Sequence, residues 1–121
     1  MKDATQYSKN VFKTIDTMKG SDFGSFFTPK GTFIFGNADP VTGPKAIADH
    51  CDQFFSMISG LSHHVAQVWQ IDNVIITQFV TTYRRKQADE LSFPGVSIWT
   101  MEGNKIAEYR IFQDNSPLFV S

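Results

Sequence analysis

The hydrophobic pattern of this chain changes its period once, near Gly60. Before Gly60, apolar residues recur at three- and four-residue spacing, which is typical of helices with one buried face. After Gly60, four segments rich in Val, Ile, Thr and aromatic residues follow one another with only short polar turns between them. Such turns favour antiparallel hairpins. Helices early in the chain and strands late in it predict an α+β fold.

Three helices and one strand are expected before this change of period. The first helix covers residues 5–19, and Gly20 is expected to end it. A shorter second helix carries Phe23, Phe26 and Phe27 and ends before Pro29, because the residue before a proline avoids helical dihedral angles. A strand is expected over residues 32–35. The third helix begins at Pro44, where the missing backbone donor costs nothing, and its buried stripe is Ile47, Cys51, Phe54, Phe55 and Ile58.

The four later strands are expected over residues 65–71, 74–84, 91–101 and 106–112. Pro94 and Gly95 interrupt the third of these strands, and they predict a bulge or bend that curves the sheet. A strongly curved antiparallel sheet with three helices on its concave side would enclose a cone-shaped pocket. Because the chain has 121 residues and no linker-like stretch, we expect residues 1–121 to form one domain.

Composition excludes several functional classes. Lys and Arg total 11 against 12 Asp and Glu, so no basic excess favours nucleic-acid binding. The single cysteine cannot form an internal disulfide or a cysteine-rich zinc site, and no spacing of residues indicates a metal or another cofactor. No apolar stretch is long enough for a membrane span, and the N-terminus has no signal-peptide core. A cytoplasmic protein that does not bind membranes is therefore expected.

The candidate catalytic residues are His63, His64, Asp114 and Tyr83. The two histidines are adjacent in a strand, so at most one of them can face the pocket. Histidine titrates near neutral pH, which suits proton transfer. Asp114 follows the last strand and is either a group at the pocket mouth or a turn residue bonded to its own backbone. The histidines are likewise either pocket residues or solvated and structural ones.

The candidate ligand-binding residues form an apolar and aromatic set with few polar groups. Such a lining suits a small hydrophobic or aromatic molecule. The alternative is that these side chains simply fill the interior. The set comprises Phe33, Phe35, Phe93, Ser97, Trp99, Tyr109 and Ile111. His50 is expected to be partly exposed, and Cys51 is expected to act as a small buried apolar residue rather than as a nucleophile.

Several local patterns, taken in order, resemble the nuclear transport factor two-like fold, which includes the SnoaL-like polyketide cyclases and the ketosteroid isomerases. The similar stretches run from Tyr7 to Leu118, nearly the whole chain. They are residues 20–22 after the first helix, 33–36 on the first strand, 40–47 opening the third helix, the hairpin residues 81–84 and the closing residues 103–114. The resemblance implies a cystatin-like cone and a homodimer that pairs through the outer face of the sheet.

The family's catalytic groups fall on positions where this chain has other residues. Ketosteroid isomerases place an Asp base, a Tyr donor and a protonated Asp near Ile34 or Phe33, Thr14 and Ser97, respectively. The last-strand Asp of the cyclases falls on Ile111, and the Arg and Asp of the epoxide hydrolases fall near Gln78 and Val80. We therefore expect a SnoaL-like protein that binds a small apolar molecule. The alternatives are an isomerase, cyclase or dehydratase that uses a His/Asp/Tyr set, and a protein-interaction module.

Overall fold

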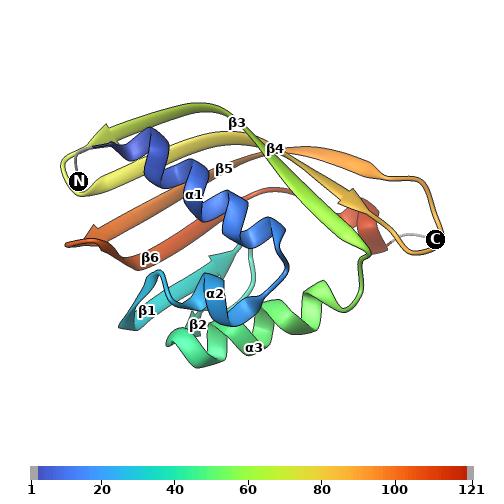
Figure 1. Cartoon of the computed structure of the whole chain (residues 1–121), viewed down its shortest axis with the longest axis horizontal. Coiled ribbons are helices and arrows are strands. Elements are labelled where there is room, and N and C mark those ends of the chain that lie inside the picture. The colour runs from blue at the N-terminus through green and yellow to red at the C-terminus, as the bar shows by residue number, and fades with distance from the viewer. Residues whose placement is uncertain (1–2, 120–121) are drawn as a thin grey trace.

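The computed structural model describes residues 3–119. Figure 1 shows three helices beside one sheet: α1 (Ala4–Asp16), α2 (Gly20–Gly24) and α3 (Pro44–Phe55). The strands are β1 (Phe27–Phe35), β2 (Val41–Thr42), β3 (Gly60–Ile71), β4 (Val74–Arg84), β5 (Leu91–Glu102) and β6 (Lys105–Phe112), and a short 3-10 helix, η1, covers Ser116–Phe119. Within the described chain, no helix combines the length and apolar character needed to cross a bilayer.

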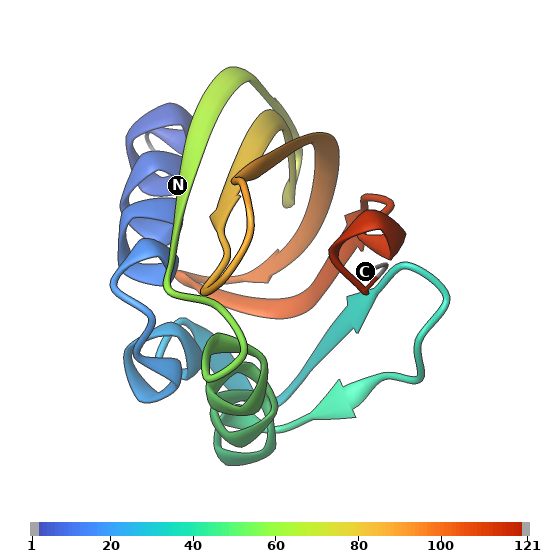
Figure 2. The ribbon, with the colours of Figure 1, turned by 90° about the vertical axis from the view of Figure 1, so that its right-hand side faces the viewer.

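The six strands form one strongly curled sheet in the order β2-β1-β6-β5-β4-β3. Figure 2 looks into this curl, with the three helices along one side of it and η1 on the other. The antiparallel meander β3–β4–β5–β6 is confirmed, as is the α+β class with three helices. The sheet is mixed rather than antiparallel throughout, because β1 pairs with β6 in parallel. The chain from β1 to β6 passes through α3 and the whole meander, which is the long crossover that a parallel pair needs.

The first helix ends earlier than the glycine signal predicts. α1 ends at Asp16, and the left-handed residue after it is Met18, with a φ of 60°. Gly20 instead opens α2, where a Cβ would lie only 2.2 Å from the Ala48 carbonyl oxygen of α3. The Gly20 N–H also donates to Asp52 Oδ1 at 2.7 Å. This glycine is therefore required for the close approach of two helices, and not to end a helix.

The second helix is also shorter than expected, and β1 is longer. Phe27 begins β1 instead of extending α2, and Pro29 lies inside the strand. The strand tolerates the proline because the β1–β6 ladder shifts register between Phe27 and Thr32, which leaves the residues between them outside the regular pairing. The two-residue strand β2 pairs with β1 and was not expected from the sequence.

Pro94 and Gly95 do not produce the expected bulge in the β4–β5 ladder, whose register runs through them without a shift. β6 pairs with β5 only from Val96 onward, so the proline lies where only one neighbouring strand is present, a position that tolerates a missing donor. Gly95 has a packing role, since a Cβ there would lie 2.7 Å from both the Phe79 ring and Gln113 Oε1.

Candidate functional site

A cavity of about 330 Å³ lies on the concave side of the sheet. Its walls come from all three helices, from β1, β3, β4 and β6, and from the segment around η1. Most of the lining is apolar or aromatic, including Phe12, Phe23, Phe54, Phe55 and Phe79. Met57 and Phe119 also line the cavity although they are 54% and 67% exposed, so they mark its opening to solvent.

Four of the seven expected ligand-binding residues line this cavity: Phe33, Phe35, Tyr109 and Ile111. Trp99 does not, because it is fully buried between the rings of Phe12 and Tyr109. Ser97 is fully buried as well, and its hydroxyl is hydrogen-bonded to Thr77. Phe93 packs on the ring of Tyr83 outside the lining. These three residues belong to the core or its margin.

The two adjacent histidines separate as strand alternation requires. His63 lines the cavity and its side chain is only 8% exposed, whereas His64 is exposed and lies outside the lining. The His63 ring stacks on Phe12 at 4.8 Å and meets Phe79 edge-on at 5.5 Å. These aromatic contacts fix the plane of the imidazole.

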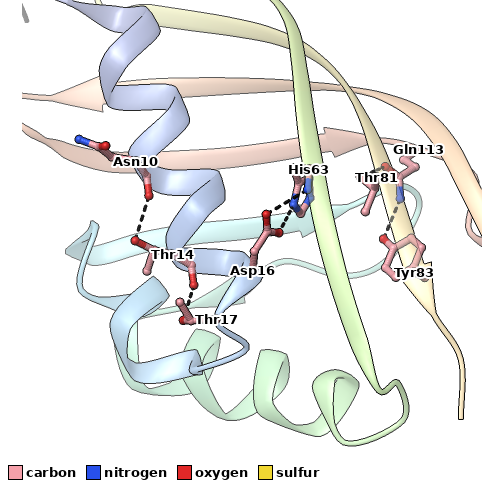
Figure 3. Close-up of polar contacts among 8 residues, drawn as sticks. All are labelled: Asn10, Thr14, Asp16, Thr17, His63, Thr81, Tyr83 and Gln113. Atoms are coloured by element: carbon pink, nitrogen blue, oxygen red, sulfur yellow. Dashed lines mark hydrogen bonds and ion pairs between the residues drawn. The ribbon is translucent and has the colours of Figure 1, made fainter.

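Asp16, the last residue of α1, holds His63 by two contacts, which Figure 3 shows. Asp16 Oδ1 lies 2.6 Å from His63 Nδ1, and Oδ2 accepts from the His63 backbone N–H at 3.0 Å. Asp16 does not line the cavity; it borders an outer groove with Lys9 and Lys13. Because a carboxylate accepts, the proton of the neutral ring sits on Nδ1, and Nε2 keeps a lone pair. Nε2 is therefore the atom that can take a proton.

A second set of polar side chains in the cavity surrounds Tyr83, which is 3% exposed. Gln113 Nε2 donates to the Tyr83 hydroxyl at 2.8 Å, and Asn115 Nδ2 donates to it at 3.1 Å. Thr81 Oγ1 donates to Gln113 Oε1 at 3.0 Å. Burial raises the pKa of the Tyr83 phenol, and these two hydrogen bonds oppose the rise. The phenol therefore stays protonated at neutral pH.

Asp114 does not join the site. Its side chain is exposed and accepts from the Ser116 N–H at 2.9 Å at the start of η1. That hydrogen bond lowers the pKa of the carboxyl group. Since Gln113 and Asn115 point into the cavity, alternation of the extended chain directs Asp114 outward. Its contacts are those of a turn residue bonded to the backbone.

Cys51 and His50 line the cavity from α3. Burial raises the pKa of the Cys51 thiol to about 12, so the thiol is protonated and unreactive at neutral pH. His50 is exposed, as expected, and its ring lies 6.0 Å from that of Phe33. Among the residues described, no three His, Cys, Asp or Glu side chains come together as a metal site would require.

Sequence reasoning missed Asp16, Gln113 and Asn115. One signal for Asp16 was available, because it lies four residues after the buried Phe12 and so on the same side of α1. Gln113 and Asn115 flank Asp114 in the chain. Had Asp114 been assumed to point outward, strand alternation would have placed both neighbours in the cavity.

The curled sheet, the three helices and the cavity on its concave side define a class of small α+β domains with an interior pocket. The chain belongs to the SnoaL-like domain family, whose model matches residues 9–109. No curated protein gives a significant match.

Similar solved structures agree on the fold. A hypothetical protein from Catenulispora acidiphila with a ketosteroid isomerase-like fold, solved with trimethylamine, superposes with a TM-score of 0.86 at 14% identity, covering 93% of this chain and 88% of that one. A protein from Jannaschia described as a SnoaL-like polyketide cyclase gives a TM-score of 0.77 at 19% identity, covering 95% of this chain and 90% of that one. An LEH-like epoxide hydrolase of M. tuberculosis gives a TM-score of 0.79 at 9% identity, covering 96% of this chain and 86% of that one. At these identities, the likeness shows the fold alone.

Proposed function

We propose that this SnoaL-like protein binds a small, largely apolar molecule in its cavity and moves a proton on that molecule with His63. The contact between His63 and Asp16 carries the proposal, since the imidazole lines the cavity while the carboxylate, 2.6 Å away, lies outside the lining. This is the His/Asp/Tyr alternative of the sequence analysis, with Asp16 in the place of Asp114.

His63 and Asp16 together have the features of a general base and the carboxylate that supports it. A base must lie within hydrogen-bond reach of the proton that it removes, and Nε2 is the ring nitrogen that Asp16 leaves available. When Nε2 takes a proton, the imidazole becomes cationic, and the neighbouring carboxylate stabilises that cation. The His63 side chain is only 8% exposed and packs on the rings of Phe12 and Phe79, and such apolar surroundings strengthen electrostatic interactions.

A test needs no knowledge of the natural substrate. The planar probe 5-nitrobenzisoxazole loses its C3 proton to a base; its N–O bond breaks, and a coloured cyanophenolate forms. We expect the protein to accelerate this reaction about 100-fold over free 4-methylimidazole at equal concentration and pH. The hydrocarbon tetralin should inhibit competitively, and His64→Gln should leave the rate unchanged. A rate no higher than that of the free imidazole would refute proton transfer.

Binding without chemistry is the second candidate. The observation in its favour is that no Asp or Glu of the described chain lines the cavity, so the lining lacks the acidic groups that known members of this superfamily use. In that case tetralin would bind saturably in calorimetry while 5-nitrobenzisoxazole reacts no faster than with free imidazole. A cytoplasmic location remains a prediction from the sequence.

The homodimer expected from the family resemblance has support on the outer face of the sheet. Trp69, Val80 and Phe112 are exposed large apolar side chains, and Val80 and Phe112 alternate with residues that line the cavity. Burying such side chains against a second copy is favourable. We expect a dimer in light scattering at micromolar concentration and a monomer for Val80→Glu, with Lys9→Glu on α1 as the control. A monomeric wild-type protein would contradict this expectation.

A further inference from the structure

The Tyr83 hydroxyl accepts two hydrogen bonds. Gln113 Nε2 and Asn115 Nδ2 both donate to it. A phenolic oxygen has two acceptor sites and one proton, so these amides occupy its acceptor capacity. Among the residues described, no side chain or carbonyl accepts the Tyr83 O–H. A buried donor without an acceptor is costly, and a molecule bound in the cavity can supply an acceptor.

These hydrogen bonds belong to a network that extends to Thr81. Thr81 is fully buried and its hydroxyl donates to Gln113 Oε1, while Gln113 Nε2 faces Tyr83. Gln113 Nε2 also donates to Asn115 Oδ1, which turns Asn115 Nδ2 toward the same phenol. Figure 3 shows Thr81, Gln113 and Tyr83 grouped at one side of the close-up, with the His63–Asp16 pair near its centre. The network therefore presents Tyr83 to the cavity as a donor.

The charge of the lining restricts the guest further. No Lys, Arg, Asp or Glu of the described chain lines the cavity. A carboxylate or phosphate buried here would lose its hydration without gaining a fixed opposite charge, which is strongly unfavourable. A neutral oxygen acceptor carries no such penalty. The raised pKa of Tyr83 agrees with this assignment, because the phenol keeps the proton that it would donate.

We propose that Tyr83 donates a hydrogen bond to a neutral carbonyl oxygen of the guest, so that the cavity selects small cyclic ketones or quinones over hydrocarbons of the same shape. This inference rests on the proposed function and names its ligand class. The sheet register agrees, since Tyr83 pairs with Leu61 and Thr81 pairs with His63. Tyr83 and His63 are therefore diagonal neighbours on one face of the sheet, close enough for a single bicyclic guest to reach both.

The experiment compares two probes that differ by one oxygen atom, the ketone 1-tetralone and the hydrocarbon tetralin. Calorimetry gives both dissociation constants, and infrared spectroscopy gives the carbonyl stretch of bound 1-tetralone. In the wild-type protein we expect 1-tetralone to bind about tenfold more tightly than tetralin, as one good hydrogen bond allows. Its carbonyl stretch should fall below the value measured in hexane.

Three variants assign this preference to Tyr83. Tyr83→Phe should weaken 1-tetralone binding about tenfold and leave tetralin unchanged. Gln113→Glu should do the same with the phenol intact, because the new carboxylate would accept the Tyr83 proton. Tyr7→Phe is the matched control: the Tyr7 hydroxyl is buried, and Tyr7 is outside the lining. This control should change neither affinity, and thermal unfolding checks that each variant is folded.

The outcomes separate the two proposals. Equal affinity for both probes in the wild-type protein, or a preference that survives in Tyr83→Phe, overturns the role of Tyr83 and leaves cavity binding intact. Failure of both probes to bind the wild-type protein overturns the proposed function and this inference together. Loss of the preference in Tyr83→Phe and Gln113→Glu, but not in Tyr7→Phe, supports the inference.

Discussion

Asp16→Asn is expected to slow proton abstraction from 5-nitrobenzisoxazole about 100-fold, as much as His63→Gln does, although Asp16 does not line the cavity. The reason is the second contact of Asp16, in which Oδ2 accepts from the His63 backbone N–H. In the asparagine variant the side-chain oxygen takes over that acceptor position, so the NH₂ group faces Nδ1. The imidazole must then carry its proton on Nε2, where it cannot act as a base.

Such tautomer reversal has a large effect in Ser–His–Asp triads, where it lowers kcat by about 10⁴-fold. Asp16 would thus be a positioning residue, and a purely structural role can be told apart from it. Nitrogen NMR of the His63 ring should show the Nδ1–H tautomer in the wild-type protein and the Nε2–H tautomer in Asp16→Asn. Thermal stability should change little, because the backbone contact is kept. Full activity in a folded Asp16→Asn variant would show that His63 does not need this carboxylate.

Gly20→Ala is expected to destabilise the protein by about 3 kcal/mol, the upper part of the range for overpacking a close contact. The added Cβ would lie 2.2 Å from the Ala48 carbonyl oxygen and 2.6 Å from Asp52 Oδ1. The Asp52 side chain can rotate, but the carbonyl belongs to the backbone of α3 and cannot move without moving the helix. Alanine normally stabilises a helix by up to about 1 kcal/mol relative to glycine, so the sign of the measured change decides which effect dominates.

Urea denaturation gives the free energy of unfolding for this comparison. Gly36→Asn is the control, since Gly36 has a φ of 56° and no atom would lie within 4 Å of an added Cβ. Asparagine tolerates this left-handed conformation, so a cost below about 1 kcal/mol is expected. Equal stability of Gly20→Ala and the wild-type protein would mean that α2 and α3 can separate at little cost.

The sequence predicted which helices and strands form better than it predicted how they contact one another. The period change near Gly60 identified the antiparallel meander because alternation of buried and exposed residues follows from strand geometry alone. Gly20 was given the wrong role, and the packing role of Gly95 was not expected, for the same physical reason. Glycine ends helices and interrupts strands, but it also permits close contact, and only the packed structure shows that Gly20 meets Ala48 and Gly95 meets Phe79.

The site was predictable where it depended on one strand and unpredictable where it joined distant segments. Alternation implied that only one of His63 and His64 could face inward, and the two do separate in this way. The partner of His63 lies 47 residues earlier in the chain, and no local pattern reports such a contact. Asp114 was chosen because it is a carboxylate, whereas the chain directs its uncharged neighbours Gln113 and Asn115 inward.

The bond from the His63 amide to Asp16 has a consequence for aggregation. β3 is the last strand of the sheet, and free amides along such a border can recruit the backbone of another molecule. α1 lies beside β3 (Figure 2), and its terminal carboxylate occupies one of these amides. The Asp16 carboxylate thereby leaves this amide unable to pair with another chain, so the same aspartate would serve both solubility and the proposed chemistry.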